Sequence, residues 1–168
     1  MNKSQKQNYI KDMTAQFENS EAVLVTHYQG LNMKQLDELT IFQFPQMVKE
    51  HCGMFIVEDL SELDHEVKRI FIVSPDSQST RGDHAHLDCW QTLVCIRGII
   101  DVIVDDGIQK KKFTLSEYGR AISVPPGFWC AQNYSAMSSL MVLCSHLYNE
   151  KDYVRDYDKY LLHKNTQE

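Results

Sequence analysis

The chain has 168 residues, of which 24% are charged and 43% hydrophobic, and its formal net charge is −6. This composition fits a small globular protein and excludes a disordered chain. No apolar run approaches the ~20 residues of a membrane helix, and the polar N-terminus lacks the apolar core of a signal peptide. The acidic balance argues against a nucleic-acid partner, because such proteins usually carry a basic face.

Cysteine usage indicates the compartment. The five cysteines are an odd number, they are widely spaced, and none forms a CxxC pair. Structural disulfides are rare in reducing compartments, where thiols stay free. We therefore expect a cytoplasmic protein.

The start of the chain differs in pattern from the rest. Its apolar periodicity predicts a helix over residues 5–17, a short strand over 22–28 and a second helix over 32–39. Asn32 is a candidate N-cap, since its side-chain oxygen can accept a first-turn N–H. We expect residues 1–40 to form an N-terminal α/β appendage.

After Ile41 the apolar period changes to two, which is the period of β-strands. Short alternating runs recur with turn residues between them, and Asp106-Gly107 supplies a tight hairpin turn. About nine strands are expected, followed by a helical tail from about Asp152 to Leu162. This pattern predicts an all-β sandwich or barrel over residues 41–168 with a C-terminal helix.

One motif places two histidines on a single expected strand. His84 and His86 are separated by one residue, and Gln91 and Gly98 follow after four and six intervening residues. Alternate side chains of a strand project from the same face, so the two imidazoles face the same way. This geometry favours a functional pair over two histidines that merely line a polar barrel mouth.

A second motif follows. It consists of Gly119, the segment Pro125-Pro126-Gly127, Cys130 and Tyr134. Together the two motifs resemble those of the cupin superfamily, spacing for spacing. The resemblance implies a cupin barrel, the double-stranded β-helix or jelly roll. In metal-binding cupins the motifs supply two histidines, a glutamate and a third histidine. Here Gln91 stands at the glutamate position and Cys130 at the later histidine position.

These two exchanges bear on metal binding. A divalent metal prefers three or four good donors, including an anionic oxygen, and a neutral amide is a poor substitute. His84, His86 and Cys130 could still form a three-ligand zinc site. The preferred hypothesis is a barrel without metal or other cofactor, in which the histidines are free for acid–base chemistry.

Further segments narrow the resemblance, and they are Arg81–His86, Leu93–Cys95, Asp105–Gly107, Pro125–Trp129 and Asp152–Asp158. Over about residues 41–162 the chain resembles the WxcM-like nucleotide-sugar 3,4-ketoisomerases, which are cupins. The resemblance implies a homodimer, dTDP-4-keto-6-deoxyglucose as the substrate, and a role in making deoxysugars for surface polysaccharide.

The resemblance also implies roles for single residues. Moving a ketone from C4 to C3 requires removal of the C3 proton, an enediol, and reprotonation at C4. His86 is the expected proton shuttle, with His84 beside it, and Arg81 is expected to hold the oxyanion or the pyrophosphate. The remaining candidates for substrate contact are Arg69, Gln91, Trp129 and Gln132. A core position for Trp129 and structural hydrogen bonds for the two glutamines are equally good interpretations.

The chain also departs from the family pattern. It reads Lys68-Arg69-Ile70-Phe71-Ile72 where relatives usually carry a tyrosine pair, and residues 50–53 lack the arginine of an early turn. Two other hypotheses therefore stay open. One is a non-catalytic cupin that binds a nucleotide sugar, and the other is a zinc- or iron-dependent cupin enzyme.

Residues 1–39 resemble something else, the start of the bacterial large-subunit ribosomal stalk-base protein. The match ends before that protein's remaining α/β fold and its stalk-binding helix. We interpret the segment as an N-terminal cap supplied by a gene fusion. The alternative is a residual contact with ribosomal RNA.

Overall fold

The computed structural model describes residues 36–49, 52–58, 60–61 and 63–165. The chain divides into two units at residue 32, which are not placed relative to one another, and the description concerns the second unit. The elements expected within residues 5–28 lie outside the described residues. Of the second expected helix, a short 3-10 helix is described, η1 (Leu36–Glu38).

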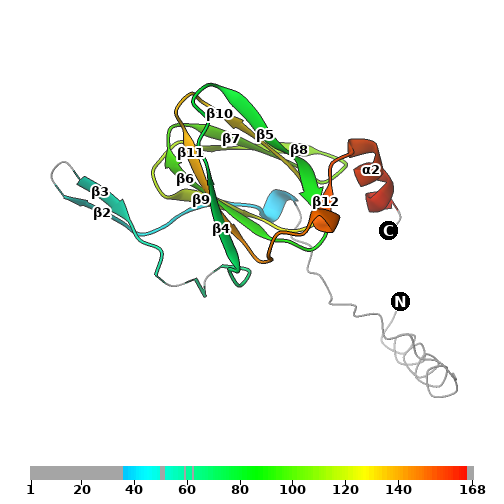
Figure 1. The fold of residues 1–168 in the computed structure, drawn as a ribbon, viewed down its shortest axis with the longest axis horizontal. Coiled ribbons are helices and arrows are strands. Elements are labelled where there is room, and N and C mark those ends of the chain that lie inside the picture. Colours follow the sequence, from blue (N-terminus) through cyan, green and yellow to red (C-terminus); the bar gives the residue numbers. More distant parts are fainter. Residues whose placement is uncertain (1–35, 50–51, 59, 62, 166–168) are drawn as a thin grey trace, which may run out of the picture. The chain divides into compact units, whose positions relative to one another are not determined.

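Two five-stranded antiparallel sheets form the barrel (Figure 1). The first sheet contains, in spatial order, β1 (Ile41–Gln43), β9 (Arg120–Val124), β6 (Gln91–Arg97), β11 (Ser139–Cys144) and β4 (Arg69–Val73). The second contains β12 (Tyr153–Val154), β5 (Ser79–His86), β10 (Trp129–Tyr134), β7 (Ile100–Asp105) and β8 (Lys110–Leu115). A separate hairpin of β2 (Gln46–Lys49) and β3 (Cys52–Phe55) projects from the barrel.

The apolar core contains buried residues from both sheets. On β7, Ile100, Val102 and Val104 are fully buried, whereas Asp101 and Ile103 between them are only partly buried. This alternation is the period of two seen in the sequence, and it turns one face of the strand toward the core. The expected all-β fold is confirmed.

The segment before β1 also contributes to the barrel. Leu36 and Leu39 are buried in the same core as the β7 residues. The division of the chain into an appendage over residues 1–40 and a domain over 41–168 stays a prediction.

A bulge interrupts β5 just before the histidines. The register with β10 shifts so that Cys130 pairs with His84 and Ala131 pairs with Gly82, which leaves Asp83 as the extra residue. Gly82 and Asp83 both have positive φ, +76° and +57°. A Cβ on Gly82 would lie 2.9 Å from the carbonyl oxygen of Cys130, so only glycine fits there.

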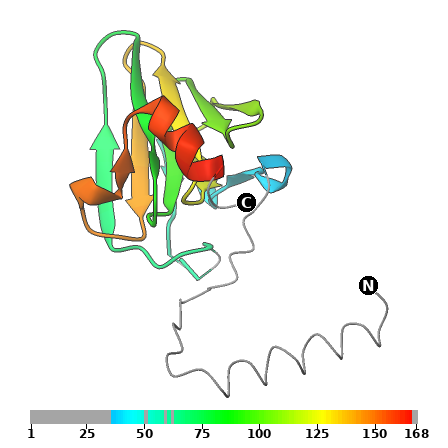
Figure 2. The ribbon, with the colours of Figure 1, turned by 90° about the vertical axis from the view of Figure 1, so that its right-hand side faces the viewer.

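The C-terminal segment differs from its sequence prediction. A helix was expected from Asp152, but the chain first forms the 3-10 helix η2 (Glu150–Asp152) and then strand β12, which pairs with β5. The helix α2 (Tyr157–Asn165) follows (Figure 2), and its Tyr160 packs with Ala85 of β5 and Trp129 of β10. Every helix in the described part of the chain is too short and too polar to cross a membrane.

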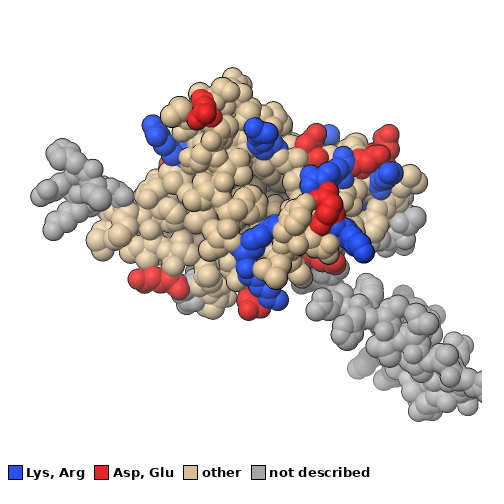
Figure 3. All heavy atoms as spheres, viewed as in Figure 1, with Lys and Arg blue, Asp and Glu red and all other residues tan. Residues whose placement is uncertain are grey.

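Charges of both signs are interspersed on the face shown in Figure 3. The one basic run, residues 110–112, lies on the edge strand β8. Its three lysine ammonium groups lie 3.1–3.7 Å from carboxylate oxygens, which belong to Asp105, Asp37 and Asp101. The run is therefore balanced by neighbouring acids and does not form an isolated basic patch.

Candidate active site

Three side chains form a hydrogen-bonded chain at the end of β5. Asp152 Oδ2 lies 2.5 Å from His86 Nδ1, and His86 Nε2 lies 3.2 Å from His84 Nε2. The backbone N–H of Asp88 donates to the other oxygen of Asp152 at 2.7 Å, which fixes the carboxylate. His86 and Asp152 are buried, whereas His84 is partly exposed. A proton can therefore pass between a partly exposed imidazole and a buried acid–base pair.

The charges of this chain follow from its surroundings. Burial acts to raise the pKa of Asp152, but hydrogen bonds from His86 and from the N–H of Asp88 outweigh it and lower that pKa. Asp152 is thus a carboxylate at neutral pH and accepts a hydrogen bond from His86 Nδ1. Burial lowers the pKa of His84, and the nearby His86 and Arg155 act in the same direction. His84 is therefore neutral at pH 7 and able to accept a proton.

Tyr153 packs on both imidazoles. Its ring centre lies 4.3 Å from that of His86 and 4.9 Å from that of His84. The guanidinium carbon of Arg155 lies 4.4 Å from the same tyrosine ring, and Arg155 is held by two hydrogen bonds of 2.9 and 3.2 Å to Glu150. Six consecutive residues thus bring a carboxylate, an aromatic ring and a cation to the two histidines.

Arg69 connects the first sheet to this group. Its Nη2 donates to Tyr153 Oη at 3.5 Å and to Cys144 Sγ at 3.4 Å. A hydrogen bond from Cys89 lowers the pKa of Cys144 to about 6, with Arg69 acting in the same direction and burial opposing both. The predicted site residue Arg69 therefore reaches the histidines through Tyr153, and it lies next to a thiol that ionises readily.

Two of the other predicted residues make hydrogen bonds to sulfur. Gln91 and Gln132 are buried, and their side-chain amides donate to Cys144 Sγ at 3.8 Å and Cys130 Sγ at 3.3 Å. Arg81 is exposed, and it pairs in register with Gln132 just before the bulge. Its guanidinium is thus available at the surface near the histidine strand.

Trp129 lies behind the histidine strand. It is 7% exposed, and its ring packs against Tyr157 and Tyr160 at centroid distances of 5.1 and 5.5 Å. Its Nε1–H donates to Asp83 Oδ1 at 3.0 Å. Of the two interpretations drawn from the sequence, the core position matches this geometry, and the tryptophan also anchors the bulge residue next to His84.

A cluster of metal-type donors differs from the set named from the sequence. Among the described residues, ligand atoms of His86, Cys89 and Asp152 lie within 4.8 Å of one another. Cys130 is not part of this cluster, although it pairs with His84 in the β5–β10 register. Burial raises the pKa of Cys130 to about 12, which keeps it a neutral thiol.

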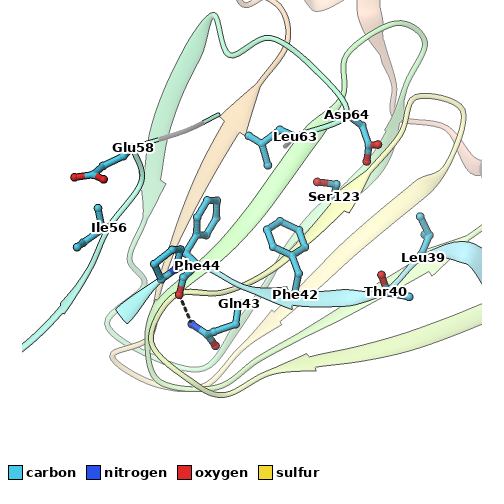
Figure 4. Close-up of a pocket in the computed structure, with 11 residues that line it drawn as sticks. Leu39, Thr40, Phe42, Gln43, Phe44, Ile56, Glu58, Leu63, Asp64 and Ser123 are labelled. Atoms are coloured by element: carbon cyan, nitrogen blue, oxygen red, sulfur yellow. Dashed lines mark hydrogen bonds between the residues drawn. The ribbon is translucent and has the colours of Figure 1, made fainter. Parts of the chain in front are cut away.

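A separate hollow of about 500 Å³ lies against β1 (Figure 4). Its lining residues are Leu39, Thr40, Phe42, Gln43, Phe44, Pro45, Ile56, Glu58, Leu63, Asp64 and Ser123. Phe42 and Phe44 meet edge to face in its wall at a centroid distance of 5.5 Å. None of the predicted site residues lines this hollow, so it is distinct from the histidine site.

Sequence reasoning missed Asp152 and Tyr153. Both lie in a segment that contributed to the family resemblance, but the expected helix there hid their placement. The adjacent Tyr153 and Val154 were the signal that could have indicated a strand, because aromatic and β-branched residues favour strands. The partner of that strand could not be read from its own residues.

Comparison with known proteins divides the chain in two. A family model described as WxcM-like, C-terminal (FdtA) matches residues 37–165. A second, ribosomal protein L10, matches residues 1–40. The large ribosomal subunit protein uL10 of Pelagibacter ubique is 72% identical over 39 residues, which are 23% of this chain and 24% of that protein.

The larger part is similar to sugar isomerases. The TDP-4-oxo-6-deoxy-alpha-D-glucose-3,4-oxoisomerase of Aneurinibacillus thermoaerophilus is 30% identical over 125 residues, covering 73% of this chain and 90% of that protein. A 3,4-ketoisomerase structure from Helicobacter canadensis has a TM-score of 0.70 and 30% identity, covering 76% of this chain and 98% of that one. A sugar 3,4-ketoisomerase from Thermoanaerobacterium thermosaccharolyticum, solved with TDP, has a TM-score of 0.72 and 23% identity, covering 79% and 98%.

Proposed function

Because the chain belongs to the WxcM-like FdtA family, we propose that it is a nucleotide-sugar 3,4-ketoisomerase. Its substrate is a TDP-4-keto-6-deoxyhexose, and its pathway is deoxysugar biosynthesis that supplies surface polysaccharide. Both resemblances drawn from the sequence are confirmed by the family matches. The observation that carries the mechanism is the chain Asp152–His86–His84.

The reaction moves a keto group without net oxidation. A base removes the proton from C3 while the C4 carbonyl oxygen gains a proton, which gives an enediol. The C3 hydroxyl then loses its proton as C4 gains one, so the sugar leaves with its ketone at C3. Since one carbon is oxidised as the other is reduced, the exchange is internal and needs no redox cofactor. Acid–base groups of the protein suffice.

We assign the base to His84, which exchanges the roles that the sequence suggested for the two histidines. His84 is neutral and engages only its Nε2, so its buried Nδ1 has no hydrogen-bond partner among the described residues, whereas both ring nitrogens of His86 already have partners. When His84 takes the C3 proton, His86 and the Asp152 carboxylate beyond it stabilise the imidazolium and hold its orientation. His84 then returns the proton at C4.

Other residues around this chain suit the remaining parts of the substrate. Arg81 is exposed on the histidine strand, and a guanidinium can pair with two oxygens of a diphosphate at once. The ring of Tyr153 packs on the histidines, and its Oη accepts a hydrogen bond from Arg69. Tyr153 thus supplies a tyrosine hydroxyl at this site, where β4 has none. We propose that this hydroxyl forms a hydrogen bond with a hydroxyl of the sugar.

Assembly and compartment complete the proposal. The edge strand β4 exposes Ile70, Phe71 and Ile72 at 56%, 37% and 59%, and an apolar sheet edge is suited to pairing with another chain. This supports the homodimer expected from the family. The described cysteines Cys89, Cys95, Cys130 and Cys144 are all free thiols, which supports the expected cytoplasmic location.

The test follows the C3 hydrogen in heavy water. The full-length protein is incubated with TDP-4-keto-6-deoxyglucose, and proton NMR monitors exchange at C3 and appearance of the 3-keto sugar. We expect both signals to change at a rate proportional to enzyme concentration, with or without a chelator. Tight TDP binding without exchange would support a non-catalytic binding cupin, and loss of activity with the chelator would support a metal-dependent enzyme.

A further inference from the structure

Cys89 stands beside the catalytic chain without a role in the proposed reaction. Its sulfur, a ring nitrogen of His86 and a carboxylate oxygen of Asp152 lie within 4.8 Å of one another. All three residues are buried, with exposures of 2%, 6% and 9%. An imidazole, a thiol and a carboxylate at such distances form a donor set that zinc accepts, and three protein ligands suffice for a zinc site.

We propose that His86, Cys89 and Asp152 form a binding site for Zn²⁺, and that the bound ion switches the isomerase off. The binding stands on the geometry alone, whereas the inhibition rests on the proposed function. This site differs from the three-ligand site considered from the sequence, because it uses Cys89 and Asp152 in place of Cys130 and His84.

The surroundings of the cluster already match those of a metal site. A metal-bound histidine normally engages its second ring nitrogen, and a metal-bound carboxylate normally has a hydrogen bond of its own. Here the two histidines meet through their Nε2 atoms at 3.2 Å, and the N–H of Asp88 donates to Asp152 Oδ1 at 2.7 Å. Both ligands are therefore oriented before an ion arrives.

Zinc binding reverses the hydrogen bond that the reaction needs. The ion replaces the proton on His86 Nδ1, and that proton moves to His86 Nε2, from which it is donated to His84 Nε2. His84 then carries its own proton on Nδ1, and the relay no longer points toward Asp152. The Cys89 thiol loses its proton to solvent as the Zn–S bond forms, so one proton is released for each ion bound.

The binding test uses cobalt as a spectroscopic substitute for zinc. The tag-free full-length protein carries Cys52→Ser throughout, so that this thiol adds no background. We expect one Co²⁺ per chain with a thiolate-to-cobalt charge-transfer band, and zinc should displace it. Cys89→Ser should weaken binding by about 100-fold, since loss of even an outer-shell partner costs about 10–100-fold. The matched control is Cys95→Ser, another fully buried thiol, which should bind as the parent does.

A second measurement does not depend on the variants folding. X-ray absorption at the zinc edge of the loaded protein should show one sulfur among nitrogen and oxygen neighbours. A shell without sulfur, or Cys89→Ser binding cobalt as tightly as Cys95→Ser, overturns the proposal.

The activity test separates this inference from the proposed function. Saturating zinc should abolish C3 exchange in the parent and in Cys95→Ser, and it should spare most of the exchange in Cys89→Ser. Inactivity of the metal-free parent would refute the isomerase and leave the binding result to stand. An active parent that binds zinc through Cys89 and keeps its full rate would refute the switch.

Discussion

The strands β5 and β4 border the same site and contribute to it in opposite ways. On β5 a bulge precedes two histidines, and the buried one bonds to a buried carboxylate. On β4 the positions where the sequence resemblance led us to expect a tyrosine pair carry no tyrosine, and Ile70 and Ile72 face outward with more than half of their surface exposed. Only Arg69, at the start of β4, hydrogen-bonds within the site.

This difference separates proton transfer from the rest of the site. The three groups that can move a proton come from β5 and from the end of η2, which is held to β5 through β12. Their hydrogen bonds to one another require nothing from β4. The loss of the family tyrosines should therefore change how the sugar and the partner subunit are held, while the acid–base chemistry remains.

The largest expected effect comes from removing the base. His84→Asn should lower kcat by about 10²–10⁴-fold, the usual contribution of a general acid–base group. Phe71→Tyr, which restores a family hydroxyl on β4, should change kcat by no more than about twofold. Both are measured as the rate of 3-keto sugar formation at saturating substrate. A large gain in kcat from Phe71→Tyr would show that proton transfer depends on β4, which contradicts its assignment to β5 and η2 alone.

A smaller loss is expected at the far end of the relay. Asp152→Asn removes the negative charge that stabilises the imidazolium and should lower kcat, by less than removal of the base itself does. Asp152→Glu keeps the negative charge and should therefore be faster than Asp152→Asn. If Asp152 served only the structure of the site, the two variants should be equally slow. An unchanged pH–rate profile in Asp152→Asn would argue that the carboxylate acts only through folding.

The strands and the histidine pair could be predicted from the sequence because they depend on local rules. A period of two fixes which face each residue takes, so Ile100, Val102 and Val104 share the core side and the two histidines share another face. The glycine of the Arg-Gly-Asp segment marks the bulge, since a side chain at Gly82 would collide with the carbonyl oxygen of Cys130.

Asp152 and Tyr153 could not be placed in this way. Asp152 and His86 are 66 positions apart in the sequence, and the residues adjacent to Asp152 in the sequence do not indicate that His86 is its partner. The helical signal of the tail was real, but it begins at Tyr157, because the residues before it pair with the open edge of β5. Pairing with a sheet edge overrode the local preference, as tertiary contacts commonly do.

The pH dependence should report on His84. Only its neutral form can take the C3 proton, and its pKa lies below the ordinary 6.5. kcat/KM should therefore be level above that pKa and fall by about tenfold per pH unit below it. Arg155→Gln removes a positive charge that lowers this pKa, so the falling limb should move to higher pH. Movement in the opposite direction would exclude His84 as the group observed.

The smallest effect concerns the support behind β5, and it tests whether the bulge matters to catalysis. Trp129→Phe removes the hydrogen bond to Asp83, and Tyr157→Phe removes one of 2.6 Å to Asp105. Each should lower the free energy of unfolding by about 1 kcal/mol, measured by urea denaturation, because each loses one hydrogen bond. Their effects on kcat should differ. Trp129 fixes the residue next to His84, so Trp129→Phe should slow turnover, whereas Tyr157→Phe should leave it unchanged. If both variants keep full kcat, the position of His84 is set by β5 itself, and the packing behind the strand serves stability alone.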